Sequence, residues 1–316
     1  MIGITMGDSS GVGPEILLKT QISVPFLVYG DLVPLQLLNT RLNLGLDLVS
    51  IDKPADYQAG RINILDAQLL REEALTPGQI NAASGHAARE YVVRATQAAL
   101  AKEISAIVTL PMNKEATQLT DPHFTGHTEL IGELCGSDDV TIMLASPDLI
   151  ATHVSTHCSL RQAIERCREP RIRRIIELTW HAARRLKPNA RVAVAGLNPH
   201  AGENGLFGEE EITDIRPAVE WARAQGWDVE GPLPPDTLFY LAVRRKKYDA
   251  VVCMYHDQGH IPSKLLDFEG GVNIALGLPI VRTSVDHGTA FDIAWKGEAS
   301  TRSFEAALEM ALRLIG

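Results

Sequence analysis

The chain has 316 residues, of which 45% are hydrophobic and 22% charged, as in ordinary globular proteins, and its net charge of −9 argues against the basic surface that general nucleic-acid binding requires. No apolar run approaches the length of a membrane span, and the amino terminus lacks the basic and apolar regions of a signal peptide, so we expect no membrane association and no secretion. Four cysteines without a CxxC pair predict free thiols and a reducing, cytoplasmic location.

Short β-branched runs alternate with longer helical patterns along the chain. The predicted strands are residues 2–6, 26–30, 62–65, 106–110, 149–155, 192–197 and 250–255. The predicted helices are residues 82–102, 209–225, 236–245 and 303–314, with two more inside 159–186, where Pro170 interrupts the pattern. Residues 264–283 have turn signals between strand-like pieces, as in an irregular hairpin. The alternation predicts an α/β fold with a mainly parallel sheet, and the length predicts about two domains.

A glycine-rich stretch, residues 7–15, follows the first predicted strand and opens a helix near Pro14. Its spacing does not match the GxGxxG fingerprint, and it lacks the lysine and serine or threonine of a phosphate-binding P-loop. Two interpretations remain open from the residues alone: a tight strand-to-helix turn, or a backbone surface close to a ligand. No GxSxG motif is present, which disfavours a serine hydrolase.

Three histidines, His157, His200 and His256, lie at or just beyond the ends of predicted strands. In a parallel sheet these ends share one edge, so three imidazoles there could hold a divalent metal with positions open for substrate. Their separations along the chain match no short zinc motif, and ordinary polar strand ends are the alternative. We expect a core role for His153 and a loop position for His260.

Five stretches carry a resemblance that extends over nearly the whole chain: residues 6–15, 125–129, 197–203, 255–259 and 273–290. They resemble the 4-hydroxythreonine-4-phosphate dehydrogenase family of vitamin B6 biosynthesis. The resemblance implies metal ligands at His157, His200 and His256, with the metal site shared across a homodimer interface. It also implies substrate-binding residues, which are His127, Thr128, Lys264, Asn273 and Arg282.

Residues 287–294 are similar to the adenine-binding loop of isocitrate and isopropylmalate dehydrogenases, which bind NAD(P) without a Rossmann fingerprint. The similarity implies two α/β domains flanking a cleft, an isocitrate/isopropylmalate-dehydrogenase-like fold. Residues 1–120 plus 280–316 would form the cofactor side, and residues 121–279 the metal-binding and dimerisation side. The implied cofactor-binding residues are Asp286, His287, Gly288, Thr289, Ala290 and Asp292. The carboxylates of Asp286 and Asp292 would repel a 2′-phosphate, which favours NAD, with NADP as the alternative.

Residues 256–262 and 290–295 are closer to a subgroup of the family that acts on 4-phospho-D-threonate and 4-phospho-D-erythronate. The resemblance therefore implies a metal-dependent dehydrogenase that oxidises and decarboxylates such a phosphorylated hydroxy acid to dihydroxyacetone phosphate and carbon dioxide. Histidine ligands favour zinc, cobalt or manganese, with magnesium as a further candidate. Asp257 and Lys264 are the candidate catalytic residues. The alternatives are 4-phosphohydroxy-L-threonine dehydrogenase of pyridoxal phosphate synthesis and a phosphosugar-binding protein without catalysis.

Overall fold

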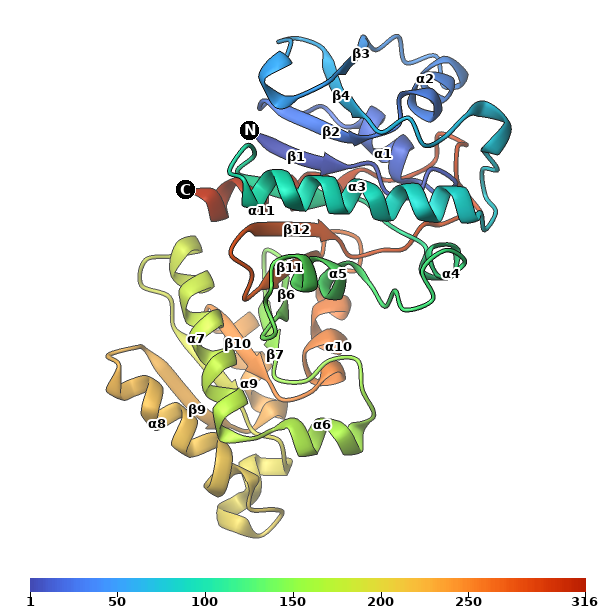
Figure 1. Ribbon diagram of the computed structural model, residues 1–316. Helices are drawn as coiled ribbons and strands as arrows, with labels where there is room; N and C mark the ends of the chain where they lie inside the picture. Colours follow the sequence, from blue (N-terminus) through green and yellow to red (C-terminus); the bar gives the residue numbers. More distant parts are fainter. The chain divides into compact units, whose positions relative to one another are not determined.

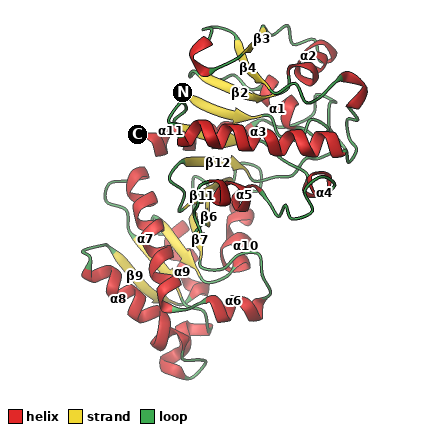
Figure 2. Ribbon diagram, viewed as in Figure 1, coloured by secondary structure: helices red, strands yellow, loops and turns green.

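The computed structural model describes residues 1–316 and divides into two compact units, one formed by Met1–Val140 with Leu278–Ile315 and the other by Thr141–Gly277. Figure 2 shows that each unit alternates strands and helices, which confirms the predicted α/β class. None of the helices combines the length and the apolar character that crossing a lipid bilayer requires.

The first unit contains six parallel strands in the order β3-β4-β2-β1-β5-β12. Its strands are β1 (Ile2–Thr5), β2 (Phe26–Gly30), β3 (Leu48–Ile51), β4 (Ile62–Asp66), β5 (Ala106–Thr109) and β12 (Val281–Val285). Its helices are α1 (Gly13–Lys19), α2 (Leu32–Arg41), α3 (Ala82–Leu100), α4 (Lys114–Gln118), α5 (His127–Leu134) and α11 (Arg302–Ile315), with short turns η1 (Pro54–Asp56) and η2 (Glu72–Ala74). The long helix α3 begins where the Asn81 side chain accepts the N–H groups of Ala83 and Ser84, and it packs on β1, β2 and β5 (Figure 1).

The second unit contains six strands in the order β11-β6-β7-β10-β8-β9. Strands β7, β10, β8 and β9 are parallel, whereas β6 runs antiparallel to both β7 and β11. Its strands are β6 (Thr141–Ala145), β7 (Ile150–His153), β8 (Val192–Ala195), β9 (Val229–Leu233), β10 (Ala250–Cys253) and β11 (Val272–Leu276). Its helices are α6 (Leu160–Arg166), α7 (Glu169–Leu186), α8 (Arg216–Ala224), α9 (Pro235–Val243) and α10 (His256–Leu266), with a short helix η3 (Pro199–Gly205) and a π-helical turn η4 (Glu211–Ile215).

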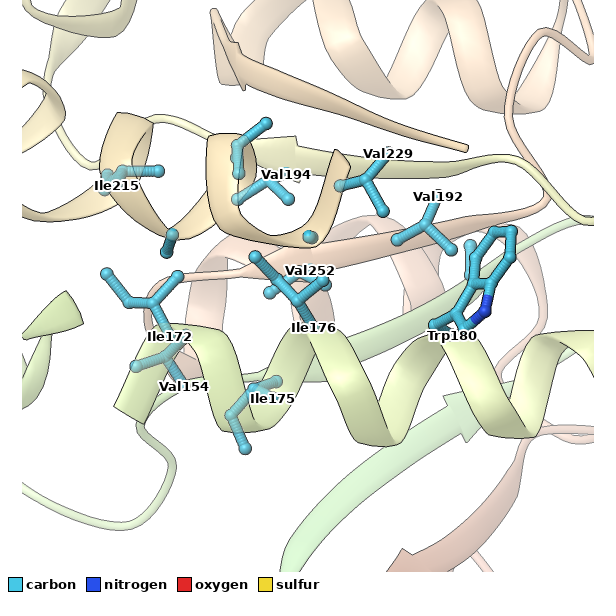
Figure 3. Close-up of a cluster of buried hydrophobic side chains, with 14 of the residues drawn as sticks. Val154, Ile172, Ile175, Ile176, Trp180, Val192, Val194, Ile215, Val229 and Val252 are labelled. Carbon is cyan, nitrogen blue, oxygen red and sulfur yellow. The ribbon is translucent and has the colours of Figure 1, made fainter. Parts of the chain in front are cut away.

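Alternate residues of the second sheet enter two different cores. Val192 and Val194 of β8 pack against Ile176 and Trp180 of α7, together with Val252 of β10 (Figure 3). Their neighbours in the same strands join a second cluster with α9; these neighbours are Ala193, Ala195, Val251 and Cys253. The sheet is therefore covered on both faces, which explains why its parallel strands are continuous apolar runs in the sequence.

Every strand predicted from the sequence is present to within two residues, and so are the predicted helices. Pro170 lies in the first turn of α7, after α6 has ended at Arg166, as the two-helix interpretation of this region requires. The predicted 209–225 helix begins with the π-helical turn η4 before α8.

One prediction is wrong. His260 lies inside helix α10 rather than on a loop, because this helix continues through Gly259 and Pro262 to Leu266. Within residues 264–283, the strand-like pieces predicted on either side of the Gly277–Pro279 turn signals are present as β11 and the start of β12.

The first unit extends to residue 140 before the chain enters the second unit, whereas the sequence predicts this boundary at residue 120. Residues 121–140 belong with the first unit because Phe124, Leu130 and Ile131 form a core cluster with Val92 of α3. The segment that carries His127 and Thr128 is thus anchored to the same unit as Arg282.

Candidate active site

The three histidines that we predicted as metal ligands follow three neighbouring strands of the second unit. His157 comes after β7, His256 directly begins α10 after β10, and His200 lies in η3 after β8. Strand β10 pairs in parallel with both β7 and β8, so the carboxyl ends of the three strands share one edge of the sheet. This is the edge at which ligands bind in open α/β sheets.

His157 and His256 lie together at this edge, with ring centroids 5.5 Å apart. They line a cavity of about 310 Å³ together with Tyr255 and Asp257. Two imidazoles on one tetrahedral ion have ring centres on the order of 5 Å apart, so this pair fits a shared divalent ion. The Nδ1 atom of His256 lies 2.7 Å from Asp257 Oδ1, which leaves Nε2 to face an ion, as in carboxylate–histidine–metal arrangements.

His200 does not join the pair within one chain. Its ring lies 6.1 Å from that of Phe207, and no group of three or more histidine, cysteine or acidic side chains forms a cation site in this single chain. The residue sits in an unusual turn, in which His200, Ala201, Gly202, Glu203 and Asn204 all have positive φ angles between 42° and 80°. Each non-glycine residue in this conformation costs roughly 1–2 kcal/mol, and such strain concentrates at functional sites.

Two further histidines support the ring of His256. The His260 ring stacks on it at 3.6 Å with an interplanar angle of 9°, and His260 Nδ1 donates to the His256 carbonyl at 3.0 Å. His153 is fully buried, as expected for a core residue, and its ring lies 4.6 Å from that of His260. Burial lowers the pKa of His153 to about 3, so it is neutral at physiological pH. Gly259 makes this packing possible, because a Cβ atom there would lie 2.4 Å from His153 Nε2.

Gln258 links the loop of His200 to that of His256. Its side-chain amide donates to the Gly196 carbonyl at 2.8 Å, and its oxygen accepts from the N–H of Met254 at 2.7 Å. Gly196 directly follows β8 and Met254 directly follows β10. The two predicted ligand loops are therefore held in fixed relation within the second unit.

The predicted substrate residues of the second unit occupy α10 and β11. Lys264 lies in the last turn of α10 with its Nζ 5.1 Å from the ring centre of Phe268. Asn273 lies in β11, and its buried Oδ1 atom has no hydrogen-bond partner. An unpartnered buried acceptor is consistent with a ligand contact at this position.

In the first unit, His127 and Arg282 provide buried polar groups that lack partners. Arg282, in β12, is 3% exposed; it donates to Thr109 Oγ1 at 2.7 Å, while its Nε atom has no partner. Burial lowers its pKa to about 10. His127 begins α5 next to Thr128, and its Nε2 atom is also buried without a partner. Burial, followed by the charges of Arg282 and Lys114, lowers the pKa of His127 to about 3.

A buried cation with an unsatisfied donor, near a half-buried neutral imidazole, costs folding free energy unless an anion completes the site. The amino terminus of α5 adds the N–H groups of its first turn to the same region. We therefore interpret His127, Thr128 and Arg282 as an anion-binding group of the first unit.

The predicted cofactor loop, residues 286–292, packs on the glycine-rich stretch of the same unit. The Thr289 carbonyl accepts from Val12 N–H at 3.0 Å, and a Cβ atom on Gly11 would lie 2.8 Å from Thr289 Cβ. Just beyond the loop, Trp295 Nε1 donates to the Ser9 carbonyl at 2.9 Å. Gly288 itself leaves open space, since a Cβ atom there would meet nothing within 4 Å. The glycine-rich turn is thus the support on which this loop rests.

The positions of the remaining predicted cofactor residues follow from that packing. Asp286 directly follows β12, with its N–H donating to Ser303 Oγ at 3.3 Å. His287 Nδ1 lies 3.0 Å from the Gly288 carbonyl. Ala290 has a φ of 42°, and the Asp292 carbonyl accepts from Lys296 Nζ. His287, Gly288 and Asp292 are exposed, whereas Thr289 is buried.

The sequence analysis did not single out Asp8, a fully buried carboxyl group in the loop between β1 and α1. Its Oδ1 atom accepts from Ser10 N–H at 2.9 Å, while Oδ2 has no partner. Burial raises its pKa from 3.8 to about 6, despite backbone N–H groups of Ser10 and Asn113 that lower it. Its position in the glycine-rich stretch that follows β1 was the signal available.

Replacing Asp8 by asparagine is expected to stabilise the protein above pH 6. In the unfolded chain Asp8 ionises near pH 4, so the free energy of unfolding falls as pH rises from about 4 to 6 and remains lower above that range. A shift of about two pKa units corresponds to roughly 3 kcal/mol. Urea denaturation at pH 4.5 and 7.5 should show a gain for Asp8→Asn that is larger at the higher pH. An equal effect at both values would contradict the raised pKa.

Comparison with known proteins identifies the family. The model of the pyridoxal phosphate biosynthetic protein PdxA family matches residues 23–311. A D-threonate 4-phosphate dehydrogenase of Pectobacterium atrosepticum is 45% identical over 99% of both chains. A 4-hydroxythreonine-4-phosphate dehydrogenase of Beijerinckia indica is also 45% identical, over 99% of this chain and 94% of the relative.

Solved structures agree with this grouping. The crystal structure of 4-hydroxythreonine-4-phosphate dehydrogenase from Klebsiella pneumoniae superposes with a TM-score of 0.89 and 44% identity, covering 100% of this chain and 99% of that one. A β-decarboxylating dehydrogenase from Thermococcus kodakarensis has a similar fold at a TM-score of 0.50 and 14% identity, covering 98% and 81% of the two chains. The isocitrate/isopropylmalate-dehydrogenase-like fold is thereby confirmed. With a match over most of its length and relatives at about 45% identity, the chain belongs to the PdxA family.

Proposed function

We propose that this chain is a metal-dependent NAD dehydrogenase that oxidises and decarboxylates 4-phospho-D-threonate or 4-phospho-D-erythronate to dihydroxyacetone phosphate and carbon dioxide. Family membership makes it an oxidoreductase acting on a CH–OH group. The naming of several relatives at 44–46% identity for D-threonate 4-phosphate supports this substrate class. The structural observation that carries the proposal is the His157–His256 pair, backed by Asp257, at the carboxyl edge of the second sheet.

The metal chemistry follows from the donor set. A divalent ion on His157, His200 and His256 would supply Lewis acidity that lowers the pKa of the substrate hydroxyl and offsets the charge that develops on decarboxylation. Zinc, cobalt and manganese suit imidazole ligands, and magnesium is the further candidate. Asp257 would hold the His256 ring in orientation through Nδ1, or accept the hydroxyl proton.

The proposed reaction is an oxidation followed by loss of carbon dioxide. The hydroxyl proton passes to a base, for which Asp257 and Lys264 are the candidates, and the hydride passes from carbon to the nicotinamide. The resulting β-keto acid loses carbon dioxide, and the remaining enolate takes a proton to give dihydroxyacetone phosphate. For Lys264, a cation on the final turn of α10, phosphate binding is the alternative role.

The anion-binding residues of the first unit would recognise the charged ends of the substrate. Arg282 offers a planar fork of N–H donors, and Thr128 and His127 offer neutral polar groups. Asn273 of the second unit would add an amide. The loop 286–292 would bind the cofactor, with NAD favoured over NADP because Asp286 and Asp292 would repel a 2′-phosphate.

We further propose that the active form is a homodimer that completes the metal site across its interface. The segments next to the three ligand histidines expose large apolar side chains, which are Leu160, Leu206, Phe207, Ile261, Leu265 and Phe268, between 48% and 85% exposed. Large apolar side chains exposed near a site are the kind of surface that protein interfaces cover. A cytoplasmic location is supported by the four cysteines, all of which are free thiols.

A second candidate function is oxidation of 4-phosphohydroxy-L-threonine in pyridoxal phosphate synthesis. The Beijerinckia indica relative, which is named for that substrate, is as similar to this chain as the relatives named for D-threonate 4-phosphate. The two substrates share the phosphate and the hydroxyl that is oxidised, and the second carries an amino group where the first carries another hydroxyl, so the residues described above would accept either.

Initial rates of NAD reduction test the proposal. The protein is loaded with zinc, cobalt or manganese and offered 4-phospho-D-threonate, 4-phospho-D-erythronate and 4-phosphohydroxy-L-threonine at equal concentration, each with NAD and with NADP. We expect the highest kcat/KM with a sugar-acid phosphate and NAD, and equal amounts of NADH and carbon dioxide. Preference for the amino substrate would support the second candidate. Binding without any rate would instead indicate a phosphosugar-binding protein.

A further inference from the structure

The turn that carries His200 is left-handed over five consecutive residues, of which only one is glycine. The φ angles are 52° for His200, 50° for Ala201, 80° for Gly202, 42° for Glu203 and 56° for Asn204. L-residues adopt this conformation one at a time, rarely in succession. A run of this length therefore needs an element outside the turn that imposes its path.

The carboxylate of Glu211 accepts hydrogen bonds from the residues that precede this turn. It is 1% exposed, and its Oε1 atom accepts the backbone N–H groups of Leu197 and Asn198, both at 2.7 Å. Its Oε2 atom accepts from Asn198 Nδ2 at 3.0 Å. These hydrogen bonds therefore fix the backbone at Leu197 and Asn198, shortly before the turn.

Two glycines make room for the same carboxylate. A Cβ atom on Gly202, in the middle of the turn, would lie 2.7 Å from Glu211 Oε2, and one on Gly196 would lie 3.1 Å from Oε1. The turn therefore approaches the carboxylate from both sides, before and after His200. Glu211 itself begins the π-helical turn η4, a rare geometry that occurs often at functional sites.

We propose that Glu211 is the positioning residue of His200: it holds the left-handed turn, and thereby the imidazole, in the orientation needed to bind the metal. This inference rests on the proposed function, in which His200 is a ligand. Glu211 does not touch the ion, substrate or cofactor in this proposal; it acts through the backbone of Leu197 and Asn198.

The neighbouring Glu210 offers a matched control. Its Oε2 atom also accepts from Asn198 Nδ2, at 2.7 Å, but Glu210 is less buried, and the backbone N–H groups of Leu197 and Asn198 donate to Glu211 instead. Glu211→Gln keeps the shape of the side chain but sets an amide NH₂ group against the Asn198 NH₂ group. Glu210→Gln makes the same chemical change beside the same asparagine.

The test measures cobalt binding to the full chain by competition with a chromophoric chelator, together with the visible spectrum of the bound ion. We expect Glu211→Gln to weaken binding by about 10- to 100-fold and to change the spectrum. Hydrogen exchange at the amides of Leu197 and Asn198 should also accelerate. Glu210→Gln should stay within about twofold of the wild type, with an unchanged spectrum.

The outcomes separate this inference from the proposed function. If the wild-type protein binds cobalt and Glu211→Gln binds it with equal affinity and the same spectrum, the positioning role is wrong. If the wild type binds no cobalt, the ligand assignment and the proposed function fail together. Should Glu211→Gln not fold, Gly202→Ala probes the same contact from the other side, because its Cβ would displace Oε2; unchanged cobalt affinity there would also overturn the inference.

Discussion

Replacing His200 by alanine is expected to abolish turnover while leaving the fold intact. The imidazole is exposed, and its ring lies 6.1 Å from that of Phe207, so its removal destabilises the folded state little. As one of three proposed ligands, however, it would be needed to hold the ion that activates the hydroxyl. Loss of even a supporting residue at a metal site typically lowers affinity or activity 10- to 100-fold, so we expect more than about a hundredfold loss in kcat.

His200→Asn separates the imidazole from the backbone, since asparagine tolerates positive φ better than alanine does. Both variants should lose bound metal, measured as the ratio of metal to protein after dialysis, and retain the far-ultraviolet circular dichroism spectrum. His86→Ala, which removes an exposed histidine from α3, should match the wild type in both respects. Full activity with stoichiometric metal in His200→Ala would remove this residue from the ligand set.

The elements that follow directly from local sequence pattern were predictable. The apolar strands β1, β2, β5, β8 and β10 are covered on both faces, and their sequences have the continuous runs that such burial produces. The missed strands include β3 and β9, which form the outer edges of their sheets. An edge strand pairs on one side alone, so β9 tolerates Gly231 and Pro232 within it, and the local pattern then reads as a turn.

The placement of the histidines was predictable in part. Strand-end reasoning placed His157, His200 and His256 after strands that share one sheet edge, and the pairing of β10 with both β7 and β8 brings these strands together. His157 and His256 lie near each other, whereas His200 does not join them within one chain. The helical position of His260 was not predictable, because Gly259 and Pro262 are helix breakers in isolation. Gly259 is needed here for packing, since no other residue would leave room for His153.

The conformation of the His200 turn could not be read from its own residues. Ala201 and Glu203 favour other backbone angles, and the carboxylate that holds the turn comes from Glu211, later in the chain. The burial of Asp8 and the unpartnered Nε atom of Arg282 could not be predicted for the same reason, because burial and hydrogen bonding are tertiary properties. Residue type at a strand end indicates a candidate, but its environment decides what the residue can bind.

Arg282→Met is expected to raise KM for the phosphorylated substrate by roughly 30-fold or more, with a smaller effect on kcat. Truncating one partner of a buried charge pair costs about 2–5 kcal/mol, and an anchor that binds substrate and transition state alike acts mainly on KM. Arg282→Ala should act in the same direction. Arg282→Lys should fall between, because it keeps the charge and loses the planar fork. Arg313→Met, on the exposed side of α11, is the matched control.

For the protein without ligand, we expect the same substitution to leave the thermal stability unchanged or to raise it. A buried guanidinium with an unpartnered Nε atom is a desolvated charge, and replacing such a group by an apolar side chain of similar size is often neutral or stabilising. We therefore expect the melting temperature of unliganded Arg282→Met to equal or exceed that of the wild type. Inorganic phosphate should raise the melting temperature of the wild type and leave that of the variant unchanged. A strongly destabilised variant, with an unaltered response to phosphate, would mean that Arg282 serves the fold and that the anion binds elsewhere.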